Sequence, residues 1–180
     1  MKNRPIVRLI TIAATLSAMQ LSYANVEIRF RESAPKDIFS LENLSQCDLK
    51  DVLLEIDLSN SVGHLIFDTT AAGAGVEVFQ PFEVKQGNMV LTSAIQVQDG
   101  DTSLSVRIDE IIAGETVSFT IDVDDTLPKS ELGNIRVSGA EIRGGAVRLS
   151  LLDKDQVTAT FGNKATALVD FKTICPAKGN

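Results

Sequence analysis

The sequence predicts an all-β protein, an antiparallel β-sandwich that follows an N-terminal export signal. Apolar and polar residues alternate with a period of two along most of the chain after residue 25, and turn-forming residues interrupt this alternation at short intervals. We expect roughly 10–12 strands, more than the seven to nine of an immunoglobulin domain. The fold is therefore either Ig-like with extra C-terminal strands or a larger jelly-roll-like sandwich.

The first 24 residues have the three parts of a secretory signal peptide. Lys2, Arg4 and Arg8 make the start positive, residues 9–21 are mostly apolar and uncharged, and small residues precede a cleavage site after Ala24. The apolar stretch is too short for a membrane anchor, which needs about 20 residues. We expect the mature chain, residues 25–180, to be secreted or periplasmic and to have no membrane span.

The clearest strand pattern lies in residues 117–124. Val117, Phe119, Ile121 and Val123 alternate there with polar residues, so one face points to a core and the other to solvent, as is typical of antiparallel sheets. Similar runs begin at Val26, Leu104, Val147, Val157 and Ala167. Turn sequences such as those at residues 99–101 and 144–145 separate these runs.

Charge and cysteine content limit the environment and the partners. The signal holds three of the 17 basic residues and none of the 24 acidic ones, so the mature chain has a net charge of −10. Such a surface repels phosphate backbones, and we expect no nucleic-acid partner. Cys47 and Cys175 are predicted to form a disulfide in an oxidising compartment, which would tie residues 25–180 into one domain. Two free thiols are the alternative.

Catalytic signals are weak. His64 is the single histidine and lies beside a turn, and a multi-histidine zinc site is excluded. A pair of carboxylates for glycoside hydrolysis stays open, because spacing in space is not visible in a sequence. The absence of tryptophan weakens both the glycosidase and the lectin hypotheses.

Acidic residues at one strand end suggest calcium. Asp122 and Asp124 share a strand face by the two-residue period, and Asp125 follows directly. Calcium needs six to eight oxygen ligands, and the spacing does not fit an EF-hand. Further ligands would come from other loops, with Asp68 as the main candidate and Asp99 or Asp101 as others. The alternative is a solvated strand edge.

A segment of small residues, 67–76, is the candidate binding loop. Phe67, Thr69, Gly73 and Gly75 mark it, and its glycines permit positive φ or close approach of the backbone. The alternative is a tight corner of the sandwich.

Two stretches resemble a known family. Residues 67–79, FDTTAAGAGVEVF, and residues 114–125, GETVSFTIDVDD, are similar to bacterial proteins labelled aggregation factor core. The resemblance covers residues 26–151 and implies an extracellular β-sandwich with cation-assisted adhesion. It implies no role for individual residues.

Together these features predict an exported, non-enzymatic module for binding or adhesion, with calcium as its candidate cofactor. Its partner would be a protein or glycan at a cell surface or outside the cell. The alternative is a hydrolase of envelope polysaccharide that uses a carboxylate pair.

Overall fold

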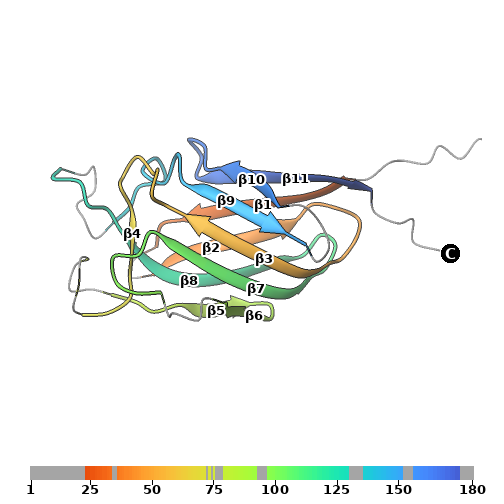
Figure 1. Ribbon diagram of the computed structural model, residues 1–180, viewed down its shortest axis with the longest axis horizontal. Helices are drawn as coiled ribbons and strands as arrows, with labels where there is room; N and C mark the ends of the chain where they lie inside the picture. The colour runs from red at the N-terminus through yellow and green to blue at the C-terminus, as the bar shows by residue number, and fades with distance from the viewer. Residues whose placement is uncertain are drawn as a thin grey trace, which may run out of the picture.

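The computed structural model describes residues 23–33, 36–71, 73, 75, 79–92, 97–129, 136–151 and 156–174. The regular structure in these residues consists of eleven strands. They form two antiparallel sheets that pack face to face (Figure 1). The predicted all-β antiparallel sandwich is therefore confirmed. No helix in this part of the chain is long and apolar enough to cross a membrane.

The first sheet contains six strands in the order β11-β1-β2-β8-β4, and β5 also pairs with β8. Every pair in it is antiparallel. Its strands are β1 (Tyr23–Arg31), β2 (Asp37–Asn43), β4 (Ile66–Asp68), β5 (Glu83–Gln86), β8 (Thr116–Asp124) and β11 (Thr166–Ile174).

The second sheet contains five strands in the order β10-β9-β3-β7-β6, also antiparallel throughout. In Figure 1 it lies in front of the first sheet. Its strands are β3 (Leu49–Asp57), β6 (Met89–Leu91), β7 (Ser103–Ile111), β9 (Ala146–Ser150) and β10 (Val157–Thr160).

A hydrophobic core fills the space between the sheets. Alternate residues of strands such as β7 are buried, which is the physical counterpart of the two-residue sequence period. Phe39 is fully buried and packs against three other rings, with centroid separations of 5.1 Å to Phe30, 5.3 Å to Phe119 and 6.4 Å to Phe161. These aromatic contacts hold the first sheet against the segment that follows β10.

Strand β8 lies inside the first sheet and changes partners along its length. On one side it pairs with β2, and beyond the end of β2 the carboxylate of Asp37 accepts a hydrogen bond from the amide of Val123 at 3.1 Å. On its other side it pairs first with β5 and then with β4, and the carbonyl of Gln80 accepts a hydrogen bond from the Asp122 amide between them. This exchange of partners brings β4 to the acidic end of β8.

The ends of the described chain bear on two predictions. Strand β1 begins at Tyr23, inside the predicted signal, while residues 1–22 lie outside the described residues. Cys175 also lies outside them, so its pairing with Cys47 stays a prediction. Strand β11 ends at Ile174 opposite Tyr23, and the segment after β2 contacts the same end of β1 through the Leu44 amide and the Asn25 carbonyl.

Candidate metal centre

The pairing of β4 with β8 brings three carboxyl groups together. In the register of the two strands Asp68 lies opposite Asp122, and Phe67 lies opposite Val123. Because side chains alternate between faces, Asp122 and Asp124 share one face of β8 while Val123 points into the core. One carboxylate oxygen from each of Asp68, Asp122 and Asp124 lies within 4.8 Å of the other two. We call these three residues the aspartate cluster.

The aspartate cluster is buried. The exposed fraction is 0% for Asp68, 5% for Asp122 and 1% for Asp124. The alternative prediction of a solvated strand edge is therefore wrong. Neighbouring backbone covers the cluster, since a methyl group added at Gly75 would lie 2.3 Å from the carboxyl carbon of Asp68.

The carboxylate of Asp68 lacks hydrogen-bond donors among the described residues. Both of its carboxylate oxygens are buried, and no donor within the described residues hydrogen-bonds to either of them. Asp37 provides the contrast, because its two oxygens accept amide hydrogen bonds from Ser33 and Val123, each at 3.1 Å. A buried carboxylate without donors is costly. A proton or a cation beside Asp68 would offset this cost.

The electrostatics of the cluster agree with this cost. Burial, followed by the neighbouring carboxyls of Asp99 and Asp124, raises the pKa of Asp68 to about 8. Burial and then the charge of Asp124 raise the pKa of Asp122 to about 7. Without a cation these carboxyls hold protons more tightly than ordinary aspartates.

Asp99 lies next to the cluster and ties it to the chain that follows β4. Its Oδ1 accepts hydrogen bonds from the amides of Thr69, at 2.9 Å, and Thr70, at 3.2 Å. Burial acts to raise the pKa of Asp99, but the neighbouring Asp68 carboxyl and hydrogen bonds from the amides of Thr69, Thr70 and Gly75 outweigh it and keep that pKa below its ordinary value. Asp99 thus carries charge beside Asp68.

Other predicted metal ligands lie apart from the cluster. Asp125 is buried, and its Oδ1 accepts a hydrogen bond from the Leu127 amide at 3.1 Å, which closes a local turn. Asp101 makes a similar local contact, with its Oδ2 accepting from the Gln98 amide at 2.7 Å. Neither belongs to the group of three carboxylates whose oxygens converge.

The residues of the predicted binding loop lie in different environments. Phe67 is fully buried on β4, so it belongs to the core rather than to an exposed loop. Gly75 packs on Asp68, and a methyl group at Gly73 would lie 1.6 Å from Oδ2 of Asp99. Both glycines thus allow close approach of backbone to carboxylate. Thr69 lies beside a pocket.

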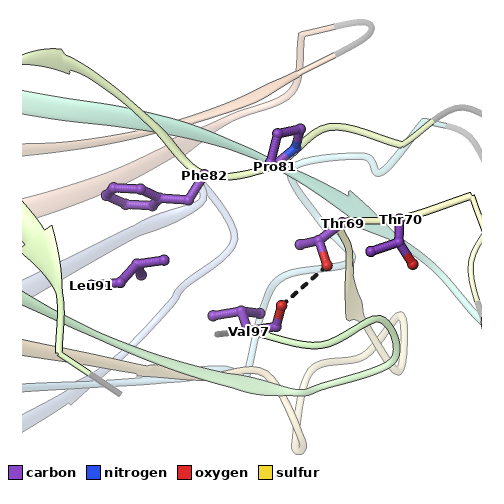
Figure 2. Close-up of a pocket in the computed structure, with 6 residues that line it drawn as sticks. All are labelled: Thr69, Thr70, Pro81, Phe82, Leu91 and Val97. Atoms are coloured by element: carbon purple, nitrogen blue, oxygen red, sulfur yellow. Dashed lines mark hydrogen bonds between the residues drawn. The ribbon is translucent and has the colours of Figure 1, made fainter. Parts of the chain in front are cut away.

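This pocket has a volume of about 220 Å³. Figure 2 shows Phe82 and Leu91 at one end of it and Thr69 and Val97 at the other, where the Thr69 hydroxyl donates to the Val97 carbonyl at 3.2 Å. Its lining is Thr69, Thr70, Pro81, Phe82, Leu91 and Val97. The pocket is mostly apolar and adjoins the cluster through the chain, because Thr69 directly follows Asp68.

His64 lies in an exposed turn. Its φ of 51° is in the left-handed region, and its carbonyl accepts a hydrogen bond from the Thr126 hydroxyl at 2.9 Å. These backbone features match a structural residue of a turn.

Comparisons with known proteins add no relatives. No family model matches the chain, and no curated protein matches it. The resemblance to the aggregation factor core proteins accordingly stays a prediction, and the function must be argued from the aspartate cluster.

The chemistry of the cluster fits a hard divalent cation. Carboxylate oxygens are preferred ligands of calcium, and three converging carboxylates provide a large part of a coordination sphere that backbone carbonyls and water can complete. Magnesium more often keeps several waters and uses fewer protein ligands. The two-residue period of β8 indicated Asp122 and Asp124, but no local sequence signal indicated that Asp99 would hold the chain after β4.

Proposed function

We propose that this protein is an exported, non-enzymatic β-sandwich module that binds a partner at a cell surface or outside the cell, and that calcium completes its fold. The proposal that calcium binds is supported by the environment of Asp68. This carboxylate is fully buried, has no hydrogen-bond donor among the described residues, and lies within 4.8 Å of two further carboxylates. A divalent cation would remove both the desolvation cost and the mutual repulsion.

The burial of the cluster favours cation binding over glycoside hydrolysis. A glycosidase places its two carboxyl groups on either side of a sugar in an open cleft. Asp68, Asp122 and Asp124 are instead covered. They are therefore poorly placed to contact a polysaccharide.

Binding of calcium is tested by isothermal titration of the mature protein after dialysis against a chelator. We expect saturable binding to wild type and none to the double variant Asp122→Asn/Asp124→Asn. Asp51→Asn is the matched control, because Asp51 is exposed and asparagine tolerates its φ of 50°. Absence of binding to wild type, or equal binding to the double variant, would overturn the metal centre.

Binding to a partner at a cell surface or outside the cell is tested with labelled mature protein. The protein is applied to intact cells, extracellular matrix and glycan arrays, in calcium and in chelator. We expect retention that is stronger in calcium. Failure to bind any of these surfaces in either condition would contradict a binding module. Turnover of an envelope polysaccharide that single Asp→Asn variants abolish would favour the hydrolase instead.

A further inference from the structure

Two chain segments that border the pocket are attached to the backbone of the aspartate cluster. The first, residues 69–71, continues directly from Asp68 at the end of β4. The second, residues 79–82, is held through Gln80, whose amide donates to the Asp68 carbonyl at 3.3 Å and whose carbonyl accepts from the Asp122 amide at 3.1 Å. A shift of β4 relative to β8 would therefore displace both segments.

Asp99 also holds the first of these two segments, residues 69–71. Its carboxylate accepts from the amides of Thr69 and Thr70, while Thr69 donates through its hydroxyl to the Val97 carbonyl. Gly73 and Gly75 pack directly on Asp99 and Asp68. The described residues that directly follow β4 thus lie against two carboxylates through close backbone contacts.

The pocket depends on these attachments. Four of its six lining residues, Thr69, Thr70, Pro81 and Phe82, belong to the two segments. Phe82 also packs against Phe119 of β8, with ring centroids 5.0 Å apart. Figure 2 shows Pro81 and Phe82 arriving at the pocket from one strand of chain and Thr69 and Thr70 from another.

We propose that the cation held by Asp68, Asp122 and Asp124 regulates this pocket by holding β4 to β8 and thereby fixing residues 69–71 and 79–82. This inference rests on the proposed function. The unpartnered oxygens of Asp68 supply its physical basis, since without a cation the carboxyl groups either repel one another or hold protons, and neither state links β4 to β8 as a shared cation does. Cation binding then stabilises the closed strand pair by mass action.

Hydrogen exchange of the full mature chain, in saturating calcium and in chelator, tests the proposal. At a calcium concentration 100 times its Kd, local opening should become about 100-fold rarer. We expect slower exchange at the amides of Thr69, Thr70 and Phe82. Amides in the middle of β3 and β7, far from the strand pair, serve as the internal reference.

Variants distinguish an effect of calcium on the pocket from a general stabilisation of the fold by calcium. In Gly75→Ala the added methyl group meets the Asp68 carboxyl, and in Asp99→Asn the anchoring charge is lost, so each should lose most of the calcium-dependent protection at residues 69–71. Gly162→Ala is the matched control, because its methyl group meets only the Thr166 carbonyl at 3.8 Å. It should respond like wild type.

The outcomes distinguish this inference from the function on which it rests. If titration shows no calcium binding, the metal centre and the regulated pocket both fail. If calcium binds but exchange at Thr69, Thr70 and Phe82 is unchanged, only the regulated pocket is overturned. Protection that persists unchanged in both Gly75→Ala and Asp99→Asn would also overturn it.

Discussion

At the scale of single residues, the central feature is the difference between two buried aspartates. Asp37 receives an amide hydrogen bond on each oxygen, whereas Asp68 receives none from the described residues and lies against other carboxyls. Backbone donors satisfy the first without any ligand. A proton or a cation would offset the cost of burying the second, which makes Asp68 the most informative position to change.

Replacing Asp68 with asparagine should stabilise the metal-free protein and remove its calcium response. The amide has nearly the same shape, carries no charge, and can donate hydrogen bonds to the neighbouring carboxyls. We expect Asp68→Asn to melt at a higher temperature than wild type in chelator and to show no rise when calcium is added. Thermal unfolding in both conditions measures this, with Asp51→Asn as the control.

The opposite pattern would contradict this view of Asp68. If Asp68→Asn were less stable than wild type in chelator and kept the calcium response, the carboxylate would have partners other than a cation.

At the scale of strands, Asp37 shows how a side chain replaces a missing backbone partner. Strand β2 ends its pairing with β8 at Asp37, and the carboxylate extends the contact to Val123. Burial raises the pKa of Asp37 to about 8, although its hydrogen bonds from Ser33 and Val123 act in the other direction. The folded protein therefore holds this proton more tightly than the unfolded chain, whose ordinary value is 3.8.

This shift predicts how stability depends on pH. A carboxyl whose pKa is raised on folding contributes stability that is complete below about pH 4 and is lost as pH rises toward about 8. In chelator, the free energy of unfolding of wild type should fall between about pH 5 and pH 8. Asp37→Asn should fall less steeply, which urea unfolding at several pH values will show. An identical slope in the variant would mean that Asp37 ionises normally.

The strands also show what a sequence pattern can and cannot predict. Alternation correctly predicted the strand around Val106, because mainly one of its faces is buried. It also predicted the strand around Phe119, but both faces of that strand are buried from Phe119 to Asp124, so its polar face does not reach solvent as expected. Strand β4 has no such pattern, since all three of its residues are buried, and β5 has none, since all four of its residues are exposed. Both were therefore invisible to a search for a two-residue period.

The same limit applies to the metal centre. The period of β8 correctly placed Asp122 and Asp124 on one face, and Asp68 was a reasonable guess from its charge. Their convergence depends on the register between β4 and β8, strands far apart in the sequence. The burial of the aspartate cluster also depends on backbone packing at Gly75, which no local pattern encodes.

At the level of the whole sandwich, both sheets share one core, and the first and last described strands pair. Strand β11 pairs with β1 along most of its length, so the last described residues lie beside the first. The segment after β2, which contains Cys47, contacts the same end of β1. Cys175 itself lies outside the described residues, and its pairing with Cys47, which would close the sandwich covalently, stays a prediction.

Reduction should therefore weaken the oxidised protein. A disulfide that closes a loop of more than 100 residues contributes about 5 kcal/mol in the chain-entropy model, and measured gains are often smaller. We expect no thiol to react with Ellman's reagent in denaturant, and a clear loss of stability in Cys47→Ser/Cys175→Ser. Two reactive thiols in freshly exported protein would show that the pair does not form.

If a cation completes the fold, the mature, oxidised protein should melt at a higher temperature in millimolar calcium than in chelator. Calcium at 100 times its Kd adds about 2.7 kcal/mol, which corresponds to a rise of about 5–10 °C for a domain of this size. We predict this rise for wild type and Asp51→Asn, and none for Asp122→Asn/Asp124→Asn. Equal melting temperatures of wild type in calcium and in chelator would contradict the metal centre.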